Sequence, residues 1–193
     1  LFRSGIAASG VQLESLDLSD NALGVRGIPR IAGAFLNQPK LRHLYFNNDG
    51  LQAEAVTALT ELIMANYGGM GSTSELRTFE IGHNCLEDAG FLSLLPILAA
   101  SPHLERLRIA TTRARNYKGE GFKLVNQLLH LRKLYSLELN DNNLGAESGP
   151  VLAQVIRNNP SLKSLNLSDI GVEEDGIRAV LKAVAKMPTN TLE

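Results

Sequence analysis

Residues 41–51, LRHLYFNNDGL, decide the fold of this sequence. The apolar residues of this stretch follow the spacing L-x-x-L-x-L-x-x-N-x-L and are Leu41, Leu44, Phe46 and Leu51. Asp49 takes the position that this pattern usually gives to asparagine. Asn47 and Asn48 stand directly before it, so three polar residues follow the predicted strand. A buried core does not require three polar residues, so we expect the function to lie at this corner.

The same pattern recurs along the whole chain. Its starts lie 28–35 residues apart, at Leu13, Leu41, Leu76, Leu104, Leu134 and Leu162. This spacing is typical of the long, helix-containing class of leucine-rich repeat. The sequence therefore predicts one α/β solenoid domain over residues 1–193, a slab of a horseshoe with parallel strands on the concave side and helices on the convex side. We expect both ends to be incomplete, because residues 1–10 look helical and Leu192 opens a seventh repeat.

Each repeat combines a strand pattern with a helical one. In 137–139 (LEL) and its equivalents, apolar residues flank a polar one, as in a strand with one buried face. Glycines are expected to supply the turn before the helix, namely Gly24 and Gly27 in the first repeat and Gly145 and Gly149 in the fifth. The second repeat carries an insert, 66–75 (NYGGMGSTSE), which predicts a mobile loop between helix and strand. Prolines that stop the helices precede four starts: Pro39, Pro102, Pro160 and Pro188.

Composition excludes several classes of function. The chain has 193 residues and a net charge of −1, whereas a dedicated nucleic-acid binder is normally basic. The longest apolar run, 94–100, is too short to cross a bilayer. Cys85 is the only cysteine, so no internal disulfide can form and a reducing compartment is expected. We therefore expect a cytoplasmic protein without a membrane span.

No enzyme site is predicted. His83, Asn84 and Cys85 are the residue types of a cysteine hydrolase, but three consecutive residues cannot converge as catalytic groups must. The four histidines lie in different repeats without the spacing of metal ligands. We therefore expect a protein that is not an enzyme and that holds neither a cofactor nor a metal.

Polar residues line the predicted rim of the sheet. The position two after each strand core carries Asp20, Asn48, His83, Thr111, Asp141 and Asp169. A basic cluster stands between the acidic ends of this surface and consists of Arg106, Arg108, Arg113, Arg115 and Lys118. Such zoning suits a protein partner with complementary charges, although a solvated rim without a partner is the better explanation of any single charge.

The asparagine position of the repeats has a structural explanation. It holds Asn21, Asp49, Asn84, Thr112, Asn142 and Ile170. Side chains at this position hydrogen-bond backbone groups of the turn. Asn48 differs, because it lies one residue before this position, is expected to point to the rim, and is not needed by the ladder of asparagine positions.

At the level of motifs the chain resembles the RanGAP family, the GTPase-activating proteins of Ran. Residues 16–24 (LDLSDNALG) look like its L-x-L-S-D-N-A-[FL]-G, and 44–50 (LYFNNDG) look like its L-Y-L-x-N-[ND]-G. The family also carries an insert in the second repeat, followed by L-R-x-x-x-x-G-R-N-R-L-E, where this chain has Leu76-Arg77 and then 82–87 (GHNCLE). Residues 137–142 (LELNDN) resemble L-D-L-x-D-N. The match runs in register over nearly the whole chain.

The resemblance implies a GTPase activator that works without an arginine finger. Asn48 matches the family asparagine that positions the glutamine of Ran, which in turn orients the attacking water. The resemblance further implies rim contacts to the partner through Asp20, Asn47, Asp49, His83, Asn84, Arg108, Asp141 and Asp169. GTP and Mg²⁺ would belong to the GTP-bound partner. We expect a cytoplasmic monomer, with any attachment to the nuclear envelope made by regions outside these residues.

The chain departs from the family pattern at two places, and a second interpretation stays open. His83 and Cys85 replace the two arginines of G-R-N-R-L-E, and the fourth repeat does not follow the family sequence. The alternative is a protein-binding scaffold of the ribonuclease-inhibitor or innate-receptor type without GTPase-activating function. In that case Tyr45, Arg106 and Arg108 would dominate binding. A single cysteine weakens the ribonuclease-inhibitor version, whose repeats are rich in cysteine.

Overall fold

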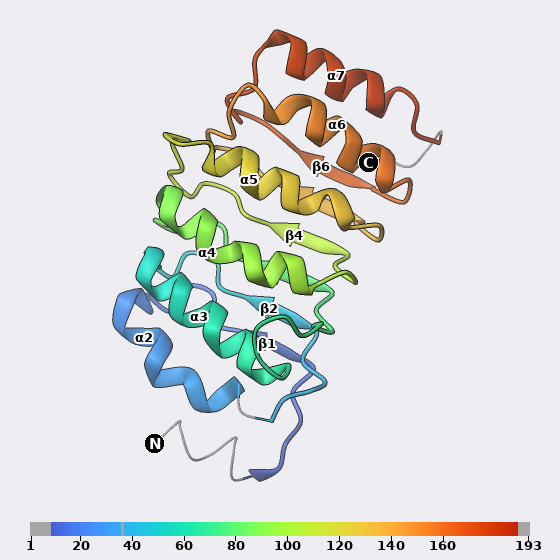
Figure 1. The fold of residues 1–193 in the computed structure, drawn as a ribbon. Helices are drawn as coiled ribbons and strands as arrows, with labels where there is room; N and C mark the ends of the chain where they lie inside the picture. Colours follow the sequence, from blue (N-terminus) through green and yellow to red (C-terminus); the bar gives the residue numbers. More distant parts are fainter. Residues whose placement is uncertain (1–8, 36, 189–193) are drawn as a thin grey trace.

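The computed structural model describes residues 9–35 and 37–188, which form a stack of repeats with helices on one side and strands on the other (Figure 1). The helix expected at 1–10 lies almost entirely outside the described residues, and so does the seventh start at Leu192. None of the described helices is long and apolar enough to cross a membrane.

Six short strands form one parallel sheet in sequence order. They are β1 (Ser15–Asp17), β2 (His43–Tyr45), β3 (Thr78–Glu80), β4 (Arg106–Arg108), β5 (Ser136–Glu138) and β6 (Ser164–Asn166). The central apolar residues of neighbouring strands pair directly, as Leu44 does with Leu16 and with Phe79. This in-register stack is the predicted α/β leucine-rich-repeat solenoid. Each strand begins one residue earlier than the apolar triplets suggest, and the second apolar residue of a triplet, such as Phe46, follows its strand and is buried.

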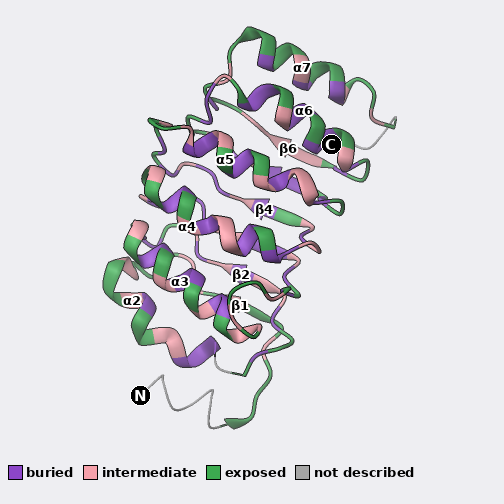
Figure 2. Cartoon of the chain, in the orientation of Figure 1, coloured by how far each residue is buried: buried purple, intermediate pink, exposed green. Residues whose placement is uncertain are grey.

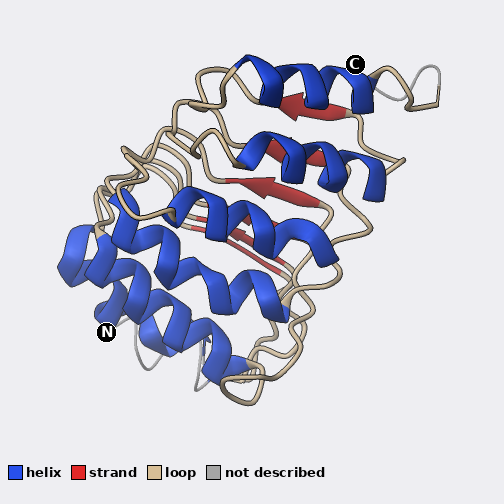
Figure 3. Ribbon diagram, turned by 45° about the horizontal axis from the view of Figure 1, so that its top comes forward, coloured by secondary structure: helices blue, strands red, loops and turns tan. Residues whose placement is uncertain are grey.

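The helices cover one face of the sheet, which leaves the other face open (Figure 3). They are α2 (Gly24–Ile31), which continues as the 3₁₀ turn η1 (Ala32–Phe35), α3 (Ala53–Asn66), α4 (Glu87–Ala100), α5 (Glu120–Gln127), followed by the 3₁₀ turn η2 (Leu128–His130), α6 (Ser148–Asn158) and α7 (Glu174–Val184). Their inner sides are buried and their outer sides exposed (Figure 2). No repeat encloses a core alone, so the stability comes from the contacts between neighbouring repeats.

Two glycines expected in turns lie inside helices. Gly27 belongs to α2 and packs against Leu23. Gly149 of α6 approaches Gly176 of α7 so closely that a Cβ at Gly149 would lie 2.2 Å from the Cα of Gly176. These glycines therefore permit close packing of backbone, which the sequence pattern alone did not indicate. The insert 66–75 does lie between helix and strand, and Ser74 bonds the carbonyl oxygen of Ala100 there.

A ladder of buried polar side chains joins the turns that follow the strands. Asn84 accepts hydrogen bonds from the N–H groups of Asp49 and Leu51, both at 3.0 Å. Its Nδ2 donates to carbonyl oxygens of two repeats, including that of Phe46 at 2.7 Å. Asn142 repeats this arrangement and accepts from the N–H of Thr112. The asparagine position therefore has the structural function that its place in the repeat predicts.

Candidate functional site

The carboxyl ends of the strands form a continuous rim of six turn residues, Asp20, Asn48, His83, Thr111, Asp141 and Asp169. All six have left-handed backbone conformations with φ between 49° and 63°. The first five donate their backbone N–H to a carbonyl of the next repeat, as Asn48 does to Gly82 at 3.0 Å. Asn, Asp and His tolerate this conformation better than most residues. The backbone conformation therefore explains part of the residue choice at Asn48.

A hollow of about 490 Å³ lies at the first repeats of this rim. Its lining consists of Ser19, Asp20, Asn47, Asn48, His83 and Arg108. Five of these are predicted site residues, drawn from four consecutive repeats. They come together because the four strands pair in register, which places equivalent turn positions side by side. We call this hollow the rim hollow.

Asn48 presents a free carbonyl oxygen at the rim hollow. Its side chain is exposed, and its Nδ2 donates to Oδ1 of Asp20 at 2.8 Å. This hydrogen bond assigns the nitrogen and the oxygen of the amide, because a carboxylate only accepts and the amide group facing it must therefore be the Nδ2 donor. Among the described residues no hydrogen bond uses the Oδ1 of Asn48. Asp20 therefore holds the amide of Asn48 in one orientation and leaves an acceptor for an incoming group.

Asn47 has the opposite character, because all its polar groups are engaged. Its Nδ2 donates to Glu80 at 3.0 Å, and its Oδ1 accepts from the N–H of Gly82 at 2.9 Å. Its own N–H donates to Ser19 Oγ at 3.1 Å. A Cβ at Gly82 would lie 3.2 Å from the Oδ1 of Asn47 and 3.3 Å from the Nε of Arg108. Asn47 therefore shapes the wall of the hollow, and little space remains beside it.

Arg108 is bound by its neighbours on the open face of the sheet. Its Nε lies 3.1 Å from Oε2 of Glu138, and its Nη2 lies 2.9 Å from Nε2 of His83. A guanidinium only donates, so in this arrangement the Nε2 of His83 is the acceptor and carries no proton. The cation that lines the hollow is thus paired and oriented along the sheet.

Two residues were predicted to contact the partner through their side chains, and this prediction is wrong because both side chains are buried. Asp49 is 0% exposed and Asn84 is 2% exposed. Both belong to the buried ladder, in which Oδ1 of Asp49 accepts from the N–H of Asn21 at 2.9 Å. A partner on the rim cannot reach them.

The other two predicted contacts lie on later parts of the rim. Asp141 accepts hydrogen bonds from Thr111 at 3.1 Å and from Asn140 at 2.6 Å. Asp169 borders a separate hollow with a mainly apolar lining that includes Ile170 and Ile177. The predicted residues thus divide into one cluster at the rim hollow and two separate acidic positions.

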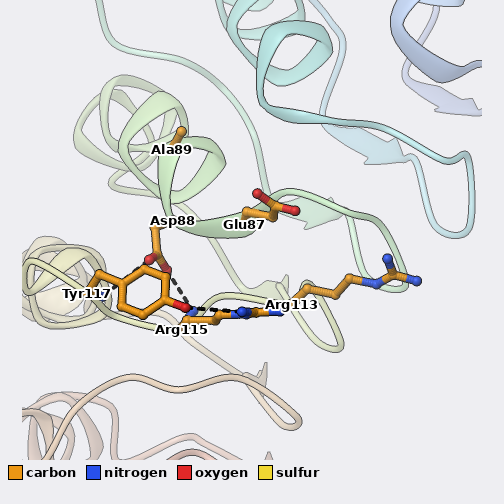
Figure 4. Close-up of a pocket in the computed structure, with 6 residues that line it drawn as sticks. All are labelled: Glu87, Asp88, Ala89, Arg113, Arg115 and Tyr117. Carbon is orange, nitrogen blue, oxygen red and sulfur yellow. Dashed lines mark hydrogen bonds between the residues drawn. The ribbon is translucent and has the colours of Figure 1, made fainter.

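A second hollow, of about 340 Å³, involves residues that the sequence analysis did not single out. Its lining residues are Glu87, Asp88, Ala89, Arg113, Arg115 and Tyr117 (Figure 4). Arg113 and Arg115 were recognised only as members of a basic cluster. Asp88 and Tyr117 were missed, although the lost asparagine position of the fourth repeat indicated an unusual turn there.

The contribution of Asp49 to the stability of the ladder depends on pH. Burial, together with the negative charges of Asp20 and Asp17, raises the pKa of the Asp49 carboxyl above its usual value, although the N–H of Asn21 lowers it. Its Oδ2 is buried and has no hydrogen-bond partner in the part of the chain that the structure describes. The folded state therefore binds the proton more tightly than the unfolded state does. This contribution to stability is complete below pH 3.8 and is lost as the pH rises through the folded pKa.

We expect the substitution Asp49→Asn to stabilise the protein at neutral pH by about 1–2 kcal/mol. An amide at this position can donate to turn carbonyls, as Asn84 does. The gain over wild type should shrink as the pH falls from 7 to 4, because the raised pKa lets wild-type Asp49 take up a proton at a higher pH than an ordinary carboxyl does. Urea unfolding at pH 4 and pH 7 measures both effects, with the exposed Asp141→Asn as control. An equal gain at both pH values, or a loss at pH 7, would contradict this assignment.

Comparison with known proteins agrees with the repeats. The family model "Leucine Rich repeat" matches residues 13–32. Ran GTPase-activating protein 1 of Saccharomyces cerevisiae is 27% identical over 180 residues, which cover 91% of this chain and 44% of that protein. Ran GTPase-activating protein 2 of Caenorhabditis elegans is 36% identical over 110 residues, which cover 54% of this chain and 11% of that protein.

A relative of another class also matches. NACHT, LRR and PYD domains-containing protein 13 of Homo sapiens is 26% identical over 175 residues, which cover 90% of this chain and 16% of that protein. The chain spans less than half the length of each of these relatives.

Fold and repeat pattern define the chain as a leucine-rich-repeat domain. Among leucine-rich-repeat proteins it is RanGAP-like, as the motifs around Asn48 indicated.

Proposed function

We propose that this domain binds a GTP-loaded Ran-type GTPase and stimulates its hydrolysis of GTP. GTP and Mg²⁺ would be held by the GTPase, and this chain would contribute positioning but no chemical step of its own. The RanGAP-like character of the chain supports the partner class, and the orientation of Asn48 at the rim hollow carries the mechanism.

The proposed task of Asn48 is to orient the glutamine of the GTPase. A glutamine amide offers two N–H donors, and the Oδ1 of Asn48 is an acceptor that no described residue occupies. A hydrogen bond between the two amides would hold the glutamine where it can orient the attacking water. Fixing a reacting group in this way lowers the barrier by positioning. A neutral amide does so without placing a further charge beside the phosphates.

The rim hollow also argues against an arginine finger. Arg108 is the one arginine among the residues that line it. Its guanidinium is paired with Glu138 and hydrogen-bonded to His83, so it lies along the sheet. A finger must project toward the transferring phosphate to stabilise the charge there. We therefore assign Arg108 to partner contact, together with Asp20 and His83, and leave the positioning to Asn48.

Substitution of Arg108 distinguishes the two mechanisms. We expect Arg108→Ala to weaken binding of the GTPase by no more than about tenfold and to leave the maximal stimulated rate within about threefold of wild type. Removal of an arginine finger would instead lower that rate by about 10³–10⁵-fold. Single-turnover hydrolysis over a range of concentrations of this protein measures the affinity for the GTPase separately from the maximal stimulated rate. A loss of the maximal rate in that larger range would show that Arg108 acts as a finger.

Asp20 is expected to be a positioning residue. Asp20→Gly removes the acceptor that orients Asn48 without straining the left-handed backbone at this position, so we expect the maximal stimulated rate to fall by about tenfold while the GTPase still binds. Asp20→Asn keeps an acceptor oxygen and should restore most of the rate. Equal losses in both variants would point to the charge of Asp20 rather than to the orientation of Asn48.

A protein-binding scaffold without GTPase-activating function is the second candidate. The match to the NACHT-domain protein and the mixed charges of the open face favour it. Arg106 lies 3.8 Å from Glu80 and is more loosely paired than Arg108, so it and Tyr45 would be the first residues to test. Capture of a GTP-loaded Ran from solution supports the first proposal, and a folded protein that does not bind it supports the second.

A further inference from the structure

The turn that follows β4 departs from its neighbours. It has Thr112 at the asparagine position and runs on to Gly119 before α5 begins. Tyr117 is 74% exposed, and Arg113, Arg115 and Lys118 are exposed with it. We call residues 113–118 the basic turn. It contributes three of the side chains around the second hollow (Figure 4).

Buried and polar contacts hold the basic turn in one conformation. Asp88, at the start of α4, accepts hydrogen bonds from the N–H groups of Arg115, Asn116 and Tyr117 at 2.7, 2.8 and 3.2 Å. Oδ1 of Asn116 accepts from the N–H of Gly121 at 2.9 Å. The carbonyl oxygen of Ala114 accepts from the N–H of Asn143 at 3.0 Å. The turn is thus anchored to the repeats on both sides, although its charged side chains lie in solvent.

The cations of the basic turn have few partners of their own. Arg115 donates to the hydroxyl of Tyr117 at 3.0 Å. Arg113 has no ion pair and no side-chain hydrogen bond among the described residues, and its side chain extends beyond the other residues of the hollow (Figure 4). Asp88 directs its carboxylate to backbone N–H groups, and Glu87 is the other carboxylate of the hollow. Two cations, Arg113 and Arg115, therefore share the hollow with two carboxylates, and the carboxylate of Asp88 is already bonded to backbone N–H groups.

We propose that the basic turn is a docking surface for an acidic segment of a protein partner. Arginine binds carboxylates through parallel N–H donors, and arginine and tyrosine are the residue types that dominate protein interfaces. A turn already fixed by Asp88 loses little conformational entropy on binding. Its place on the same rim as the rim hollow lets one partner contact both. The inference goes beyond the proposed function and does not depend on it.

Charge favours a protein segment over a nucleic acid. The net charge of the chain is −1, and the carboxylates of Glu87 and Asp88 lie beside the arginines of the basic turn. A polyphosphate that extends past the turn would meet these carboxylates. A short acidic segment can end within the reach of Arg113, Arg115 and Lys118.

The test is a direct titration without any GTPase. A fluorescein-labelled hexaglutamate peptide is added to this protein at low ionic strength, where exposed charges are least screened, and anisotropy is recorded. We expect saturable binding that weakens at least fivefold in the double variant Arg113→Ala with Arg115→Ala, and at least twofold in Tyr117→Ala. The exposed Arg157→Ala on α6 is the matched control and should change binding less than twofold. Thermal unfolding verifies that each variant is folded.

Three results would overturn the proposal. The first is that the peptide fails to bind, and the second is that the double variant binds it as tightly as wild type does. The third is that a single-stranded oligothymidylate of equal charge binds more tightly than the peptide and depends on the same arginines. That result would make the surface a nucleic-acid site. Because no GTPase is present, none of these results bears on whether the domain stimulates GTP hydrolysis.

Discussion

Replacing Asn48 by glycine should lower the maximal rate of stimulated GTP hydrolysis by about 100-fold or more. The substitution deletes the amide that would hold the glutamine of the GTPase. Glycine is the informative replacement because Asn48 has φ of 53°, a conformation that glycine adopts without strain. The affinity for the GTPase should stay within about threefold, since Asp20, His83 and Arg108 still line the rim hollow. Single-turnover kinetics at saturating concentrations of this protein measure the rate apart from the affinity.

The matched control is Asp169→Gly at the equivalent turn of the sixth repeat. Asp169 has φ of 49° and lies outside the rim hollow, so the same backbone change occurs without loss of the amide. Its rate should remain within twofold of wild type. If Asn48→Gly keeps the full rate, the positioning task belongs to another residue. If both variants lose it equally, the loss comes from the turn rather than from the amide.

Replacing Asn84 by alanine should destabilise the fold by about 3–5 kcal/mol, a large part of the stability of an ordinary domain. Asn84 is buried and makes five hydrogen bonds to backbone groups of two repeats. Alanine would leave the buried N–H groups of Asp49 and Leu51 without acceptors. Asn21 takes the same position in the first repeat but is exposed, and its side chain bonds only two carbonyl groups. Asn21→Ala should therefore cost only about 1 kcal/mol.

Urea unfolding of both variants tests the ladder. A cost for Asn84→Ala no larger than that for Asn21→Ala would show that the ladder contributes little. The comparison also bears on the site, because the turn that carries Asn48 is held by the bond from the N–H of Asp49 to Asn84.

Periodicity was sufficient to predict the fold. The spacing of Leu41, Leu76 and the other starts predicted the six repeats, and alternation within each strand predicted which side chains face the open side of the sheet. Patterns of this kind state which residues are buried, but not how closely two helices approach. The contact between Gly149 and Gly176 depends on that distance, and the glycine pattern predicted only a turn at Gly149.

The candidate site was predicted in part. The rim position of Asp20, Asn48 and His83 follows from register, and the structure brings these residues together with Arg108. Asp49 and Asn84 were misplaced because a side chain one position further along the turn points into the ladder rather than to the rim. Asp88 was missed because its partners are backbone N–H groups of an irregular turn, and no residue pattern encodes such bonds.

The most direct test of the proposed function is single-turnover hydrolysis of GTP by Ran, with and without catalytic amounts of this 193-residue protein. If the domain stimulates hydrolysis, the rate should rise by at least about 10³-fold, of the order that GTPase-activating proteins produce. Asn48→Gly should remove most of that acceleration. An unchanged rate of hydrolysis in the presence of folded wild-type protein would contradict the proposed function and favour a protein-binding scaffold.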